Sequence, residues 1–599
     1  MTTTTAVRDD RMPPGIPYII TNEFAERFCF YGINSILTVY MVQFLHFTDA
    51  DGATWQSLFK SGAYFFPLLG AIVSDVFWAK FRTIITFSMV YVLGCFTLAL
   101  TSDKAGMALG MFLVAFGTGG IKPCVSTNVG DQFTSRNQHL IERAFSWFYL
   151  AINAGSSISI FLCPLLLQDP KWGPKFAFGM PGVMMAIATF AFWLGRKKFA
   201  VVPPAMSSGN NRGAALFLLS FAPILALSAW AYTQAGPLGA LIAIGAQFVL
   251  AVYLCLKTSL KNKLPPELVH WLEQGFTGEG LRLVGRLLIV YFFVAMFWML
   301  WDQSNGNTWT LQAQSSLMDK NLGFGITLLP AQLQVVNGLL ILILVPIFTY
   351  VLYPLLGRLF EVTPLRRIGI GLFTVASSFL IVAWIEQEIQ DGRGVSMWWQ
   401  ILAYVVLTAS EVLVSITALE YSYKQAPLRM KSFIMALFLL STSVGNVLIA
   451  AVNQAMIKPL EATEISAGIA TWVTLPSAAE FITGQKIDFT GDNGIQVTLP
   501  EGKTAPLEGT FLVAEIDAMQ HRVRLMDVVN RQPVQTQGEY KRSGEVSTYY
   551  LVGPNYFYFF VAVMTVMGII FVFVAMAVKE KTFVRDDHHM EAAAETPPG

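Results

Sequence analysis

The chain has 599 residues, of which 54% are hydrophobic and only 13% are charged, and its formal net charge is +1. Such a composition leaves too little polar surface to cover a soluble globule of this size. We therefore expect an integral membrane protein whose surroundings are the lipid bilayer, and no nucleic-acid partner.

Apolar runs of the ~20 residues that cross a bilayer recur along the chain, each bounded by Gly, Pro or charged clusters. They predict an all-α polytopic membrane protein. The fourteen expected spans are 16–45, 54–79, 83–101, 105–128, 141–168, 178–196, 214–234, 237–257, 284–304, 326–353, 366–387, 397–423, 430–456 and 554–578.

The order of these spans predicts two six-helix bundles with an inserted helix pair. Six spans precede the basic cluster at 196–198, and six more begin near residue 284. Duplicated bundles of this kind usually bind substrate near the bilayer midplane, between the two halves. We expect these units: an N-terminal bundle at 1–200, a linker with the extra pair at 201–280, five helices at 281–458, a β-rich insertion at 459–552, the last helix at 553–580 and a disordered cytoplasmic tail at 581–599.

The insertion at 459–552 differs in composition from the rest of the chain. It is polar, and short alternating runs such as KIDF and IQVTL are separated by turn signals such as TGDNG. Lys and Arg gather in the short loops of one side, which predicts cytoplasmic termini in the cytoplasmic (inner) membrane and an extracytoplasmic insertion.

The first span contains NEFAERFCFYG at residues 22–32. Glu23, Glu26, Arg27 and Tyr31 lie at helical spacing and share one face. Burying a charge in hydrocarbon costs at least ~2.5 kcal/mol, so these groups should face one another or a watery space. Two acids around one base leave a surplus carboxylate suited to proton coupling. The alternative is a structural ion pair near the cytoplasmic boundary.

Lys122 lies in GTGGIKPCVSTNVGDQF, after small residues that permit close helix contact. A lysine this deep must find an acid partner or lose its proton. If it pairs with the cluster of Glu23, Glu26 and Arg27, the set holds two bases and two acids, which can reorganise when one proton arrives. The alternative is that its side chain extends to the cytoplasmic interface.

The second half has matching acids. Asp302 lies at the outer end of the seventh core helix, where a carboxylate could act as a gate. Glu420 and Glu411 are nine residues apart, which is about two and a half turns, so they face different directions. We choose Glu420 to line the shared space, the alternative being an interfacial position near Lys424.

Three uncharged polar side chains lie within apolar runs: Tyr64, Asn153 and Asn337. Each could bind substrate or serve only as a hydrogen bond between helices.

Four motifs together resemble the proton-coupled oligopeptide transporter family of the major facilitator superfamily: NEFAERFCFYG, SDVFWAKFRTI, FYLAINAGS and LEYSYKQAP. The resemblance implies a twelve-helix facilitator with an extra helix pair. It also implies a symporter, not an enzyme, that imports di- and tripeptides with protons by alternating access, as a monomer and without a cofactor.

The family's substrate contacts carry over to matching positions of this chain. Arg27, Lys122 and Tyr31 would engage the peptide carboxylate, and Glu420 and Asn337 would hold the α-ammonium. A cavity with cations on one half and an acid on the other compensates a zwitterion's desolvation at both ends.

The remaining carried-over roles concern the peptide backbone and the proton. Asn153 and Tyr64 would contact the backbone, while Glu23 and Glu26 would take up the proton with Lys122 as their electrostatic partner. The apolar part of the pocket would come from Phe30, Trp301 and Phe438.

One departure from the family concerns the outer gate. Asn34 stands where many relatives have a basic residue, which removes the expected partner of Asp302. We hypothesise that Lys60, one turn before Tyr64, replaces that partner.

Two other functions stay open. The same fold could carry nitrate or another small anion with protons, although such members tend to lack the complete E-x-x-E-R set. A different class is a membrane sensor or receptor that acts through its β-rich insertion.

Overall fold

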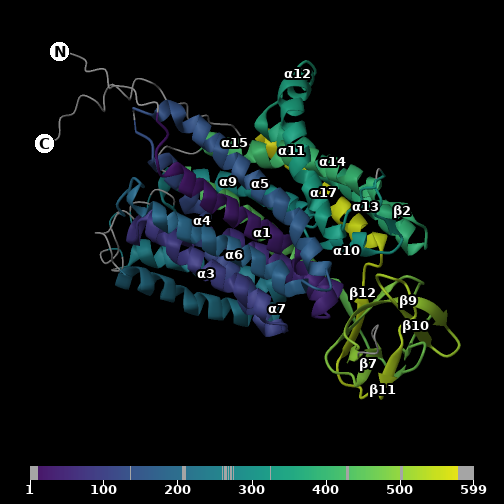
Figure 1. Ribbon diagram of the computed structural model, residues 1–599. Helices are drawn as coiled ribbons and strands as arrows, with labels where there is room; N and C mark the ends of the chain where they lie inside the picture. The colour runs from purple at the N-terminus through teal and green to yellow at the C-terminus, as the bar shows by residue number, and fades with distance from the viewer. Residues whose placement is uncertain are drawn as a thin grey trace, which may run out of the picture.

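The structure, a computed structural model, shows a body of long helices with a β-rich domain at one end (Figure 1). It describes residues 11–577 except 135, 205–210, 259–260, 262–265, 267–268, 270–272, 274–275, 324, 426–430 and 499–503. The tail expected at 581–599 lies outside the described residues.

The N-terminal bundle has six long helices around one apolar core. Helix starts follow side-chain capping: Thr48 accepts a hydrogen bond from the backbone of Asp51, and Asp103 does so from Gly106. The elements are α1 (Ile16–Phe44), α2 (Asp49–Ile72), the π-helical η1 (Val73–Phe77), α3 (Lys80–Leu100), α4 (Lys104–Asp131), η2 (Gln138–Leu140), α5 (Ile141–Gln168), α6 (Gly173–Leu194) and η3 (Gly195–Lys197).

The extra pair is present as α7 (Asn211–Lys257), whose two arms meet at a kink. Ala235 and Gly236 leave helical geometry there, and Gly236 takes a φ of +62°, which glycine adopts without strain. The Gln247 amide donates to Ser228 Oγ at 3.2 Å, so the arms lie side by side. Its apolar surface is largely exposed, as expected for a hairpin that faces lipid.

The C-terminal bundle is more irregular, because two π-helical segments interrupt its spans. These are η6 (Phe348–Leu352) and η7 (Val412–Ile416). The other helices are α9 (Gly278–Trp301), α10 (Thr308–Gln314), η5 (Pro330–Gln334), α11 (Val335–Ile347), α12 (Tyr353–Leu356), α13 (Pro364–Gln390), α14 (Met397–Glu411), α15 (Thr417–Gln425), α16 (Lys431–Ala455) and α17 (Pro554–Ala577). Strands β1 (Met318–Asp319) and β2 (Val395–Ser396) pair in parallel.

Among the described residues, eleven helices are long and apolar enough to cross a membrane. In these eleven, the two arms of α7 are counted as one helix. Helices α1 and α2 are not among them, and both carry buried charged side chains. The predicted fold class, an all-α membrane protein of two bundles with an inserted pair, is confirmed.

The β-rich domain is inserted between α16 and α17. Its seven-stranded antiparallel sheet has the order β3-β12-β6-β9-β10-β5-β4, and a second sheet has the order β11-β7-β8. The strands are β3 (Ile457–Leu460), β4 (Glu464–Ser466), β5 (Trp472–Thr474), β6 (Lys486–Thr490), β7 (Ile495–Thr498), β8 (Thr504–Pro506), β9 (Gly509–Asp517), β10 (Arg522–Asp527), β11 (Thr536–Gly538) and β12 (Glu545–Tyr549).

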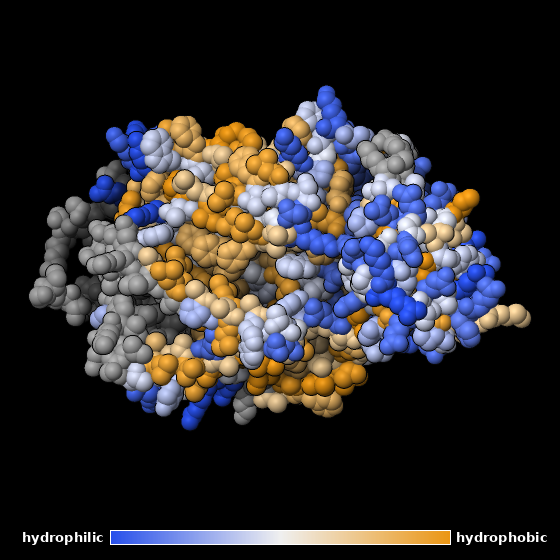
Figure 2. Space-filling model, turned by 90° about the horizontal axis from the view of Figure 1, so that it is seen from below, coloured by the Kyte–Doolittle hydropathy of each residue, from blue (hydrophilic) through white to orange (hydrophobic). Residues whose placement is uncertain are grey.

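The helical body and the β-rich domain differ in the polarity of their surfaces. Figure 2 shows apolar side chains over much of the helical body and hydrophilic ones over the β-rich domain. The first strand pairs with the last, Lys458 opposite Thr548, so the domain leaves and rejoins the helical body at one place.

Candidate functional site between the two bundles

The charged face of α1 points into the N-terminal bundle. Glu23 and Glu26 are fully buried. Arg27 Nε lies 2.7 Å from Glu23 Oε1 and 3.3 Å from Glu26 Oε2, and the Thr118 hydroxyl donates a hydrogen bond to Glu26. Helical spacing places one guanidinium between two carboxylates, as the sequence predicts. The cluster is therefore internal and not a headgroup contact.

Lys122 lies near this cluster but makes a different contact from the one expected. Its Nζ sits 3.8 Å from the ring centroid of Phe30 and 4.4 Å from that of Tyr64. Within the described part of the chain this buried nitrogen has no hydrogen-bond partner. Lys122 therefore forms no direct ion pair with Glu23 or Glu26, and its ammonium rests on two aromatic faces while staying within electrostatic reach of both carboxylates.

Close helix packing places Lys122 at this depth. A Cβ at Gly119 would lie 2.4 Å from Phe66 Cβ, and a Cβ at Gly70 would lie 2.3 Å from the carbonyl oxygen of Gly119. Only glycine fits at these contacts, so α2 and α4 approach backbone to backbone. This approach brings Tyr64 of α2 over Lys122 of α4.

The acid of the opposite bundle is Glu411. Its Oε2 accepts hydrogen bonds from Asn337 Nδ2 at 2.8 Å and from Trp301 Nε1 at 3.0 Å. Asn337 also donates to Thr408 Oγ1 at 3.0 Å. Three elements, α9, α11 and α14, thus hold one carboxylate by charge-assisted hydrogen bonds.

The choice of Glu420 over Glu411 is corrected by this geometry. Glu420 is exposed in α15, on the far side of η7, whereas Glu411 ends α14 in the middle of its span. The signal was available in the sequence, since Glu411 lies near the middle of the expected span 397–423, whereas Glu420 lies close to its end. A carboxylate in that position needs internal donors, and Asn337 and Trp301 supply them.

The other predicted residues differ in how closely they join the site. Tyr31 lies within electrostatic reach of Arg27 and Glu26 on one side and of Glu411 on the other. Phe30 is buried and packs edge-on against Tyr31, with ring centroids 5.5 Å apart. Tyr31 therefore lies between the charges of the two bundles.

The hydrogen bond of Asn153 and the aromatic contact of Phe438 are each made within their own bundle. The Asn153 amide donates to the carbonyl of Tyr149 in its own helix at 2.8 Å, and it is half-buried. Phe438 is buried, with its ring centroid 6.1 Å from that of Tyr291.

A buried polar layer joins the bundles on the side of the β-rich domain. Lys60 Nζ lies 3.0 Å from Asp302 Oδ1, and both side chains are at most 3% exposed. Asn446 donates to the other carboxylate oxygen at 2.7 Å, and Lys60 also donates to the carbonyl of Asn305 at 2.7 Å. The hypothesis that Lys60 replaces the missing partner of Asp302 is confirmed as a contact.

Two further contacts reinforce this layer. Asn34 donates to the side-chain oxygen of Asn305 at 3.1 Å, and Ser61 and Ser443 share a hydrogen bond of 2.8 Å between α2 and α16. The bundles are thus bonded to each other between the charged cluster and the β-rich domain. Within the described ranges, no group of three or more His, Cys, Asp or Glu side chains could hold a metal ion.

Two helical bundles with ionisable groups buried between them define a polytopic membrane protein of the facilitator type. The profile of the POT family matches residues 81–473, about two thirds of the chain. The chain belongs to the POT family. The match begins after α1, so Glu23, Glu26 and Arg27 lie outside the matched range.

Relatives and solved structures agree with this assignment. Solute carrier family 15 member 2 of Oryctolagus cuniculus is 35% identical over 401 residues, which are 63% of this chain and 50% of that protein. Peptide transporter family 1 of Caenorhabditis elegans is 33% identical over 62% of this chain and 44% of its own length. The chain thus spans about half the length of the curated relatives it matches.

Among solved structures, the in meso crystal structure of the POT family transporter PepTSo is similar, with a TM-score of 0.61. It is 35% identical, and the match covers 74% of this chain and 90% of that one. The crystal structure of an auto-inhibited POT family peptide transporter matches equally well, with a TM-score of 0.61 and 35% identity over 74% of this chain and 89% of its own.

Proposed function

We propose that the protein is a proton-coupled symporter that imports di- and tripeptides across the cytoplasmic membrane by alternating access. One observation carries the proposal: cations lie on one bundle and a carboxylate on the other. Arg27 and Lys122 belong to the N-terminal bundle, whereas Glu411 and Asn337 belong to the C-terminal one. A peptide zwitterion presents the complementary pair of charges.

In this proposal the substrate's carboxylate binds Lys122 and Arg27, with Tyr31 beside them, and its ammonium binds Glu411 and Asn337. Glu411 takes the role that the family resemblance gave to Glu420. Lys122 suits the carboxylate because its ammonium rests on two aromatic faces and, among the described residues, has no hydrogen-bond partner.

Tyr64 and Asn153 lie beside the peptide backbone, and Phe30, Trp301 and Phe438 form the apolar wall. Tyr64 and Phe30 already flank the Lys122 ammonium, and Trp301 donates to Glu411.

Coupling to the proton follows from the shared guanidinium. Arg27 contacts Glu23 and Glu26 at once, so it is neutralised while both acids are ionised. A proton on Glu26 removes one negative charge, and Arg27 becomes available to the substrate carboxylate. Proton and peptide then bind together, which is what symport requires.

The arrangement across the membrane supports import. The start of α1 and the end of α17 lie at the face opposite the β-rich domain, and we propose that this face is cytoplasmic. The Lys60–Asp302 layer closes the extracytoplasmic side, so alternating access opens the bundles by breaking it. One chain supplies both halves of the site, so we propose that a monomer transports.

Uptake of labelled dialanine into proteoliposomes, with and without an inward proton gradient, tests the proposal. The wild type should accumulate dialanine only with the gradient. Glu26→Gln should abolish gradient-driven accumulation but leave counterflow exchange, and Lys122→Gln should reduce both. Unchanged accumulation in Glu26→Gln would remove Glu26 from the mechanism.

Transport of nitrate alone is the second candidate on this fold. Glu411 and Arg27 both lie within electrostatic reach of Tyr31, and a carboxylate there repels a small anion that has no cationic end. Nitrate uptake without dialanine uptake would favour this candidate over the peptide.

A further inference from the structure

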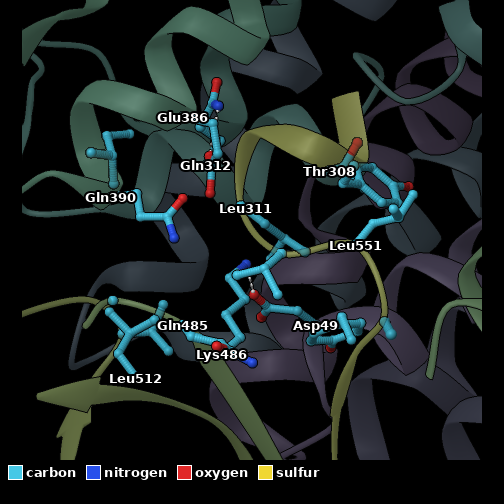
Figure 3. Close-up of a pocket in the computed structure, with 18 of the residues that line it drawn as sticks. Asp49, Thr308, Leu311, Gln312, Glu386, Gln390, Gln485, Lys486, Leu512 and Leu551 are labelled. Carbon is cyan, nitrogen blue, oxygen red and sulfur yellow. Dashed lines mark hydrogen bonds and ion pairs between the residues drawn. The ribbon is translucent and has the colours of Figure 1, made fainter. Parts of the chain in front are cut away.

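A cavity of about 130 Å³ lies where the β-rich domain meets the helical body (Figure 3). Its walls come from α2, α10, α13, α16 and α17 on one side and from β6, β9, β12 and the turn after β10 on the other. None of its residues belongs to the site between the bundles. It is therefore a second, separate cavity on the face of the β-rich domain.

The walls are mainly apolar, as in most sites for small organic molecules. Leu311 and Ile389 come from the helices, and Leu512 and Leu551 come from the β-rich domain and the segment that follows it. Apolar walls of this kind can contact ligand side chains of different shapes.

An acid and a base line this cavity without pairing. Glu386 Oε2 accepts a hydrogen bond from Gln312 at 2.8 Å, and Arg531 Nη2 donates to the carbonyl of Ile389 at 2.7 Å. In the part of the chain that the structure describes, no direct ion pair joins Glu386 to Arg531, and Arg531 Nε is buried without a hydrogen-bond partner. Burial lowers the pKa of Arg531, and the nearby Glu386 opposes that shift.

The other charged groups of the cavity neutralise each other. Lys486 Nζ lies 2.6 Å from Asp49 Oδ2, and Figure 3 shows this pair on the opposite side of the cavity from Gln312 and Glu386. Glu386 and Arg531 take no part in this ion pair, although Glu386 lies within electrostatic reach of both Lys486 and Arg531.

Three carboxamides of the cavity also have a buried atom without a partner among the described residues. These atoms are Gln312 Oε1, Gln390 Nε2 and Asn453 Nδ2. Buried polar atoms in native proteins are nearly always hydrogen-bonded, so water or a ligand must satisfy them. The acceptor can bind the N–H of a peptide bond, and the two donors can bind its carbonyl oxygen.

We propose that this cavity binds a short zwitterionic peptide, with its carboxylate on Arg531, its ammonium on Glu386 and its amide groups on Gln312, Gln390 and Asn453. Water alone would satisfy the carboxamides, but it would not explain an unpaired acid and base within one apolar cavity. The proposal concerns equilibrium binding and does not depend on transport.

Calorimetric titration of dialanine into the full-length protein in detergent tests the site. The background variant Lys122→Gln/Glu411→Gln removes the site between the bundles, and one saturable dialanine site should remain. Adding Arg531→Gln or Glu386→Gln should weaken that site by about tenfold or more, since each removes one charged hydrogen-bond partner. Dialanine blocked at both ends should not bind.

Arg542→Gln is the matched control. Arg542, like Arg531, is an arginine of the β-rich domain with a positive φ, +51° against +57°, but it lies outside the cavity. Its substitution should leave binding unchanged. Leu551→Trp, which fills the cavity without changing charge, provides a second test if the charge variants fail to fold.

Two outcomes would overturn the proposal. One is the absence of any dialanine binding in the background variant, which would mean that the cavity holds water only. The other is binding that Arg531→Gln, Glu386→Gln and Leu551→Trp leave unchanged. Because no gradient is present, the result stands whether or not the wild type accumulates peptide.

Discussion

At the scale of single residues, the site depends on which carboxylate of the α14–η7–α15 span faces the opposite bundle. Glu411 holds hydrogen bonds from Asn337 and Trp301, whereas Glu420 is exposed in α15. One span therefore carries a carboxylate held inside the protein and another at its surface, and we propose that only the inner one binds substrate.

We expect Glu411→Gln to raise the KM for dialanine by about tenfold to a hundredfold, because the peptide ammonium loses a charged partner. Glu420→Gln, the matched control on the same span, should stay close to wild type. Initial rates of uptake over a range of dialanine concentrations measure both variants. A larger effect of Glu420→Gln than of Glu411→Gln would contradict the assignment.

The buried ion pair of Lys60 and Asp302 allows a second prediction at the scale of single residues. Lys60→Ala leaves the carboxylate with Asn446 as its main partner and should cost about 3–5 kcal/mol of stability. The double variant with Asp302→Ala should cost less than the sum of the two single variants. Thermal unfolding in detergent and uptake measure the cycle, and additivity in both would show that the contact has no energetic coupling.

At the scale of elements, the approach of α2 to α4 sets the depth of Lys122. Gly70→Ala would place a Cβ 2.3 Å from the carbonyl oxygen of Gly119, so we expect a loss of about 1–3 kcal/mol. Gly130→Ala, in the partner helix α4 and with open space around its Cβ position, is the control. Equal unfolding temperatures for the two variants would show that the helices can move apart without loss.

The β-rich domain docks through a hydrogen-bond network that includes the buried carboxyl group of Asp488. Asp488 in β6 accepts hydrogen bonds from Thr510, at 2.6 Å, and from Tyr549, and the backbone N–H of Asp49 in α2 donates to Thr510 Oγ1 at 2.8 Å. Burial raises the pKa of Asp488 to about 7, against the opposing effect of these hydrogen bonds, while the nearby Asp49 adds to the rise and Lys486 opposes it.

A raised carboxyl pKa means that the folded domain keeps a proton that the unfolded chain has lost. The contribution of Asp488 to the free energy of unfolding is therefore greatest below the carboxyl pKa of the unfolded chain, near 4. It decreases as the pH rises to about 7. We expect limited proteolysis of the β-rich domain to be slower at pH 5 than at pH 8. Asp488→Asn should weaken this dependence, and an unchanged dependence would assign it to another group.

At the scale of the whole molecule, the β-rich domain and the transport site occupy different places. The domain joins the body at Lys458 and Thr548, which are register partners, so a two-residue Asn-Gly turn can replace residues 459–547. The site between the bundles uses no residue of that segment. Its residues come from α1, α2, α4, α5, α9, α11, α14 and α16.

We expect the shortened protein to retain gradient-driven dialanine uptake while losing the peptide site at the cavity of Figure 3. Proteoliposome uptake and titration in the Lys122→Gln/Glu411→Gln background measure the two effects separately. Loss of uptake by a shortened protein that still elutes as a single folded species would favour a sensor or receptor role for the domain.

The sequence by itself determined the class of fold and the face of α1. Apolar runs of bilayer length leave one way to satisfy the backbone, as helices, and the i, i+3, i+4 spacing puts Glu23, Glu26 and Arg27 together without any tertiary information. The hypothesis that Lys60 contacts Asp302 came from the resemblance to the family, whose usual basic residue is Asn34 here, and the structure shows the contact.

Tertiary structure alone decided which groups meet across helices. Helical spacing says that Glu411 and Glu420 face different ways, but only the placement of α9 and α11 shows which one finds donors. Lys122 lies between Phe30 and Tyr64 because α2 and α4 touch at glycines, and no local pattern fixes that register. The cavity beside the β-rich domain likewise joins segments far apart in the chain, and such contacts follow from packing instead of local sequence.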